Sequence, residues 1–68
     1  MQLSARNVLE GTVIDIRKGA VAALVKIELA GGQVVTSMVT VEAVEALGLA
    51  VGDRASAVIK ATEVMLAR

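Results

Sequence analysis

The chain has 68 residues, seven of them basic and seven acidic, so its formal net charge is zero. It contains no His, Cys, Phe, Tyr or Trp, although 56% of its residues are hydrophobic. These facts exclude disulfide staples and a Cys/His zinc site, and they remove the side chains that bury the most area. The balanced charge argues against a general nucleic-acid or polyanion binder, which carries a basic face or stripe.

The apolar content is high for so short a chain. Residues 1–68 are expected to form one domain, and a domain of this size buries only about 60% of the surface of its unfolded chain. A core of Val, Ala, Ile and Leu cannot hide all the apolar side chains, so burial against other copies is expected, as in an obligate homo-oligomer. No apolar run is long enough for a membrane span and no signal pattern occurs, which makes the cytoplasm the default location.

Alternating apolar side chains predict the first three strands. Residues 8–17 have one apolar and one mixed face, and residues 20–30 repeat an apolar side chain at every second position. Gly31 and Gly32 form a two-residue hairpin signal, because both positions tolerate a positive φ. Residues 33–39 are then expected to return as the third strand.

A short helix is predicted after the third strand. Thr40 is a suitable N-cap, and Val41, Val44 and Leu47 are spaced about one helical turn apart. Gly48 is expected to end the helix in the left-handed conformation.

The rest of the chain returns to a strand pattern. After a turn at Gly52 and Asp53, residues 54–62 predict a fourth strand, and residues 64–66 extend its pairing or form a fifth. The predicted fold is therefore all-β, a small OB-like barrel of about five strands with one short helix, assembled as a homo-oligomer. Several strands are apolar on both faces, and the second face is interpreted as subunit contact.

Two polar clusters near the chain ends carry the functional signal. Ser4 and Arg6 combine a hydroxyl with a permanent cation, and Lys60 precedes Ala61 and Thr62 in the same way. Neither cluster contains an acid, a His or a Cys, so donors and positive charge occur without acceptors. Such a set suits a fully deprotonated oxyanion and not a metal cation or a nucleophile. The residues alone also allow an ordinary polar arm at Arg6 and a lysine that snorkels from an edge strand at Lys60.

Four blocks, in this order and spacing, resemble the molbindin family, also called the molybdenum-pterin-binding (Mop) domain. They are SARN before a valine-rich strand, Lys18-Gly19-Ala20-Val21, Leu47-Gly48-Leu49, and Ile59-Lys60-Ala61-Thr62. The resemblance covers nearly the whole chain and implies binding of molybdate or tungstate, dianions that only accept hydrogen bonds. It further implies a homohexamer, built as a trimer of dimers, that stores or buffers the anion.

The resemblance also implies site residues, with no cation ligand among them. Ser4, Arg6 and Thr40 would contact the anion together with Lys60 and the backbone N–H of Ala61. Ser4 and Arg6 of one chain would meet Lys60 and Ala61 of another. This chain departs from the family pattern at Ala43, where many relatives have serine.

A second, symmetry-axis type of anion site is implied at Lys18, Gly19 and Val21. Relatives often have Asn where this chain has Ala22, and that change removes both amide donors. An ordinary turn between strands is the alternative explanation of this segment.

Three other classes of function were weighed against storage of an oxyanion. A structural scaffold with weak or vestigial anion sites is the main alternative, favoured by Ala22 and Ala43. Nucleic-acid binding lacks the aromatic platforms and the basic groove that it needs. An enzyme is not expected, because the chain has no His, no Cys and no clustered carboxylate pair.

Overall fold

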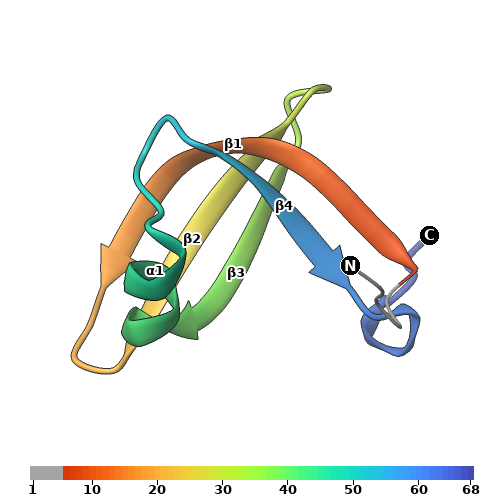
Figure 1. Ribbon diagram of the computed structural model, residues 1–68. Helices are drawn as coiled ribbons and strands as arrows, with labels where there is room; N and C mark the ends of the chain where they lie inside the picture. The colour runs from red at the N-terminus through yellow and green to blue at the C-terminus, as the bar shows by residue number, and fades with distance from the viewer. Residues whose placement is uncertain (1–5) are drawn as a thin grey trace.

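The computed structural model describes residues 6–68. Four antiparallel strands form one sheet in the order β3-β2-β1-β4. Figure 1 shows that this sheet curls into an open half-barrel, with β4 crossing in front of the hairpin formed by β2 and β3. The strands are β1 (Asn7–Lys18), β2 (Ala22–Leu29), β3 (Val34–Thr40) and β4 (Arg54–Ile59). The all-β prediction is confirmed, with four strands in the described residues instead of about five.

The long strand β1 holds the sheet together because it pairs on both sides. Its first half pairs with β4 and its second half with β2, and the two sets of pairs overlap at Gly11 and Thr12. A Cβ atom at Gly11 would lie 2.5 Å from the carbonyl oxygen of Glu28 and would also collide with Ile27. Glycine therefore allows the close approach of β2, and an irregular register between Val13 and Asp15 adds a bulge that bends the strand further.

The helix α1 (Val41–Leu47) closes one end of the half-barrel. The side chain of Thr40 accepts a hydrogen bond from the Ala43 N–H, and Gly48 adopts the left-handed conformation with φ 63°. Both predicted helix boundaries are thus confirmed. The helix buries Val44 against a small core, whose members are Val13, Ala23, Val25, Ile27 and Val44.

The C-terminal prediction was wrong in its detail. Strand β4 ends at Ile59, not at Thr62, and a 3₁₀ turn follows at Ala61–Glu63. In this turn the N–H of Glu63 donates to the carbonyl oxygen of Lys60. This bond turns the backbone away from the ladder that β4 makes with β1. Residues 64–68 form no strand.

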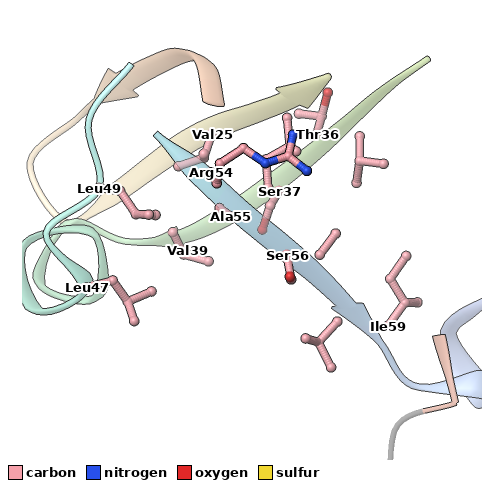
Figure 2. A pocket seen from close by; sticks show the side chains of 14 residues that line it. Val25, Thr36, Ser37, Val39, Leu47, Leu49, Arg54, Ala55, Ser56 and Ile59 are labelled. Carbon is pink, nitrogen blue, oxygen red and sulfur yellow. The ribbon is translucent and has the colours of Figure 1, made fainter. Parts of the chain in front are cut away.

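An open groove runs along the inside of the half-barrel, between the two outer strands. Because the strand order is linear, β3 and β4 each have a neighbour on one side only. We call this space the β3–β4 groove; it has a volume of about 740 Å³. Its apolar lining includes Val25, Ile27, Val35, Val39, Ala55 and Ala57 (Figure 2).

None of the helices in residues 6–68 has the length and apolar character required to cross a bilayer.

Candidate functional site

Arg6 and Lys60 both lie at one end of the sheet. They directly flank Asn7 and Ile59, the last paired residues of β1 and β4. The side-chain amide of Asn7 donates to the carbonyl oxygen of Ile59 at 3.2 Å and fixes the end of this ladder. Both Arg6 and Lys60 are exposed. The pairing of β1 with β4 thus brings these two cations to the same end of a single chain, whereas the family resemblance implies that Arg6 of one chain meets Lys60 of another.

The backbone after Lys60 adds a donor to this end. Ala61 begins the 3₁₀ turn, and its carbonyl oxygen accepts a hydrogen bond from the Val64 N–H at 3.3 Å. Within the part of the chain that the structure describes, the Ala61 N–H donates to no loop, turn or cap acceptor. The Ala61 N–H follows Lys60 directly and lies at the same end of the sheet.

Charge at this end is not neutralised by the described residues. The ion pairs found between residues 6 and 68 join Arg17 to Asp15 at 3.1 Å and Arg54 to Glu10 at 3.9 Å. Neither involves Arg6 or Lys60. An arrangement of cations and a backbone donor without a carboxylate partner favours an anion. Ser4, the remaining member of this predicted cluster, lies outside the described residues.

Thr40 lies at the opposite end of the half-barrel, where β3 passes into α1. It pairs with Ala22 of β2, and its side-chain oxygen accepts from the Ala43 N–H at 3.0 Å. Accepting this bond uses a lone pair and leaves the hydroxyl proton free to donate. Capping α1 and donating to an anion are therefore compatible roles for this exposed side chain.

The predicted second-site segment lies beside Thr40. The Val41 N–H donates to the carbonyl oxygen of Val21 at 2.7 Å, which ties the segment to the start of α1. The Gly19 N–H donates to the carbonyl oxygen of Ala22 at 2.8 Å, so this donor is already used inside the turn. Lys18 is exposed.

The predicted site residues thus fall into two groups that one chain keeps apart. Arg6, Lys60 and Ala61 lie where β1 begins and β4 ends, whereas Thr40 and the 18–21 segment lie beside α1 (Figure 1). The β3–β4 groove and the smaller hollow beside Glu10 and Arg54 are lined by other residues. A pocket that used both groups would therefore need a second copy of the chain.

No set of three or more His, Cys, Asp or Glu side chains between residues 6 and 68 is grouped to hold a metal ion. The donor groups described above instead match the chemistry of an anion that accepts hydrogen bonds.

Comparison with known proteins identifies the chain. The TOBE domain matches residues 3–66. A probable molybdenum-pterin-binding protein of Haemophilus influenzae is 50% identical over 66 residues, which cover 97% of this chain and 96% of that protein. Molybdenum-pterin-binding protein 1 of Clostridium pasteurianum is 46% identical, with 97% of each chain covered. The chain belongs to the molbindin family.

Solved structures agree with the fold of this molbindin. A molybdate-binding protein from Sporomusa ovata superposes with a TM-score of 0.94 at 37% identity, over the full length of both chains. The cytoplasmic molybdate-binding protein ModG, in a form with molybdate bound, gives a TM-score of 0.87 at 61% identity. That match covers 90% of this chain and 43% of ModG. The resemblance seen in the sequence is thereby confirmed.

The two departures from the family pattern meet at one end of this molbindin. Ala22 is the strand partner of Thr40, and Ala43 donates its backbone N–H to the Thr40 side chain. Both positions therefore lie beside Thr40. The end that carries Arg6 and Lys60 contains neither departure.

Sequence reasoning missed the β3–β4 groove. Four of its lining side chains, Val35, Val39, Ala55 and Ala57, are apolar and alternate with more exposed neighbours along the two outer strands. The sequence signal that could have predicted the groove is the second apolar face of several strands. That face was interpreted as a subunit contact, but its position in the fold was not predicted.

Proposed function

We propose that this molbindin binds molybdate, or the closely similar tungstate, at contacts between copies of itself and buffers the anion in the cytoplasm. The observation that carries the proposal is the end of the sheet where Arg6, Lys60 and the Ala61 N–H come together without a carboxylate partner among the described residues. Support comes from relatives that are molybdate-binding or molybdenum-pterin-binding proteins. No bond is made or broken in this function.

The proposed site combines Ser4, Arg6, Thr40, Lys60 and Ala61. Since the Arg6 group and Thr40 are separated within one chain, the shared pocket requires at least two copies. A hexamer arranged as a trimer of dimers is the assembly that the family resemblance implies. In the second type of site, Lys18 and the Val21 N–H are the proposed donors, because the Gly19 N–H is used in its turn.

Calorimetric titration with molybdate, tungstate and sulfate tests the proposal. Molybdate should bind, and Arg6→Ala or Lys60→Ala should weaken binding roughly tenfold or more, because each removes a charged hydrogen-bond donor. Lys26→Ala is the matched control, since Lys26 faces Thr36 and Asp15 in the middle of the sheet. Absence of heat with both molybdate and tungstate, or equal binding of sulfate, would refute the proposal.

A structural scaffold remains the second candidate. It is favoured by the alanines at positions 22 and 43, which remove polar groups around Thr40. Native mass spectrometry with and without molybdate separates the two functions. A storage protein takes up a fixed number of anions per assembly, whereas a scaffold keeps the same assembly with none.

A further inference from the structure

Asn7 is an unusual residue for the start of a strand. Asparagine is depleted in β-strands, because its short amide side chain offers the backbone other hydrogen bonds. The two residues that follow it in β1, Val8 and Leu9, are apolar instead. Asn7 is also the only asparagine among the 68 residues. Its place in β1 therefore suggests a contact that needs an amide at this position.

The side chain of Asn7 joins two segments that are far apart in the sequence. Its Nδ2 atom donates to the carbonyl oxygen of Ile59, 52 positions away, at 3.2 Å. Both residues are half-buried, whereas the neighbouring Arg6 and Lys60 are exposed. Because water competes less well at a half-buried site, this hydrogen bond is stronger than a fully exposed one. It directly adjoins the two exposed cations along the chain.

The backbone beyond β4 shows what this bond holds in place. The Lys60 carbonyl oxygen accepts from the Glu63 N–H at 2.8 Å, a bond that lies inside the 3₁₀ turn. No side chain caps the beginning of this turn at Lys60. The bond inside the turn fixes the shape of the turn but not its direction from the sheet. The Asn7 side chain, by contrast, ties the last paired residue before the turn to β1.

We propose that Asn7 is a positioning residue of the anion site, which holds Ile59 so that Lys60 and the Ala61 N–H leave the sheet in a fixed direction. This role rests on the proposed function. Asn7 acts through these donors and not by touching the anion. Without its amide, the donors have more freedom, and the anion must order them when it binds. A neutral amide suits this role because it places no negative charge beside the cations.

Nuclear magnetic resonance tests the hydrogen bond itself. The side-chain amide signals of Asn7 are identified by their loss in Asn7→Leu, since no other asparagine is present. One Asn7 amide proton should exchange with water at least severalfold more slowly than those of Gln33, which is exposed. This protection should be present before molybdate is added. Exchange as fast as that of Gln33 would overturn the proposal.

Calorimetry with molybdate tests the consequence for binding. Asn7→Leu should weaken binding roughly threefold to tenfold, although every predicted donor to the anion is kept. Thr12→Val is the matched control. It removes the hydrogen bond that Arg54 donates at 3.1 Å across the other end of the same ladder, and it should leave the affinity unchanged. An equal loss in both variants would indicate a general weakening of the ladder and would overturn the positioning role.

A double-mutant cycle separates positioning from a loss of overall stability. If Asn7 acts through Lys60, then Asn7→Leu should weaken binding about twofold or less once Lys60 is alanine. In a Thr40→Ala background the full loss should return, because Thr40 lies at the other end of the sheet. A general loss of stability would weaken binding equally in both backgrounds. Equal losses would therefore overturn the proposal.

Asn7→Asp provides a second variant of nearly the same shape. Its carboxylate cannot donate to the Ile59 carbonyl oxygen, and its charge repels a dianion. Binding should therefore weaken more than in Asn7→Leu. Circular dichroism and sedimentation show whether the sheet and the assembly are kept. A folded Asn7→Asp protein that binds molybdate as tightly as the natural chain would overturn the proposal.

These measurements also distinguish this proposal from the proposed function. Molybdate binding by the natural chain, with no loss in Asn7→Leu, would overturn the positioning role and leave the proposed function standing. Absence of binding to the natural chain would overturn the proposed function and, with it, the role of Asn7.

Discussion

The two ends of the half-barrel differ in how much of their surface one chain can cover. All five buried core residues belong to the end formed by the second half of β1, β2 and α1. Strands β3 and β4 contain only exposed and half-buried residues. The fully buried side chains therefore lie on β1, β2 and α1, and the outer strands add only partly buried side chains to this core, namely Val39, Ala55 and Ala57.

The difference shows where assembly and ligand binding are to be expected. A chain can bury its core at one end of the sheet and still leave apolar side chains and charged groups exposed at the other end. Arg6, Lys60 and the apolar residues 64–66 all lie at the end of the sheet where β1 begins and β4 ends (Figure 1). The following substitutions test this difference between the two ends.

The largest effect is expected at Gly11, where β1 joins the two ends. Gly11→Ala would force a Cβ against the Glu28 carbonyl and Ile27, so the free energy of unfolding should fall by about 3 kcal/mol. Urea denaturation at fixed protein concentration measures the change. Gly31→Ala is the matched control, because nothing lies within 4 Å of its Cβ position. Equal stability of the two variants would mean that β1 does not approach β2 as described.

A smaller loss of stability is expected from a valine-to-alanine substitution, and its size should differ between the buried core and β4. Val13→Ala empties a position that is 0% exposed and should cost about 2 kcal/mol, whereas Val58 on β4 is 49% exposed. Val58→Ala should change the stability of a dilute sample by about 0.5 kcal/mol or less. Denaturation over a range of protein concentrations tests this. Equal losses at high dilution would contradict the contrast between the ends.

Thr40 allows capping and anion binding to be separated. Thr40→Ala should lower the free energy of unfolding by about 1 kcal/mol through loss of the N-cap, and should also weaken molybdate binding. Thr40→Asp restores a good cap but places a negative charge beside the anion, so stability should recover while binding is lost. Thermal melts and calorimetry measure the two properties. Unchanged molybdate affinity in Thr40→Asp would remove Thr40 from the proposed site.

The smallest effect is expected at the exposed ion pair between β1 and β4. Arg54 donates to the Thr12 hydroxyl at 3.1 Å and lies 3.9 Å from Glu10, with both charged side chains largely exposed. Glu10→Gln should therefore change stability by about 0.5 kcal/mol at most. A loss well above that value would mean that this ion pair is less exposed in solution than the side chains of Arg54 and Glu10 are in one chain.

The sequence predicted the local elements well where a local cause exists. The cap at Thr40 and the left-handed Gly48 depend on backbone preferences of one to four residues, so they can be predicted without the fold. The glycine hairpin was predicted as a two-residue turn, but residues 30–33 separate β2 from β3, and of the two glycines only Gly32 has a positive φ. The end of β4 was predicted three residues too late, because Ile59–Thr62 keeps an apolar pattern while the 3₁₀ turn bonds compete with the ladder. Whether residues 64–66 pair as a strand depends on a partner that a local pattern does not contain.

The candidate site was predictable in its chemistry and not in its layout. Residue types alone indicate hydrogen-bond donors and cations without acceptors, and the spacing of the motifs indicates the family. That Arg6 lies beside Lys60 follows from the register of β1 on β4, which is a long-range contact. That Thr40 lies at the other end follows from the strand order.

The sequence alone was enough to predict the kinds of element, and it shows a chain without His or Cys in which 56% of the residues are hydrophobic. These properties depend on composition and on contacts between near neighbours. The tertiary structure decided which residues share an end of the sheet and which surfaces stay uncovered. Those outcomes depend on the curl of β1 around Gly11, which brings distant strands together and leaves the outer two apart.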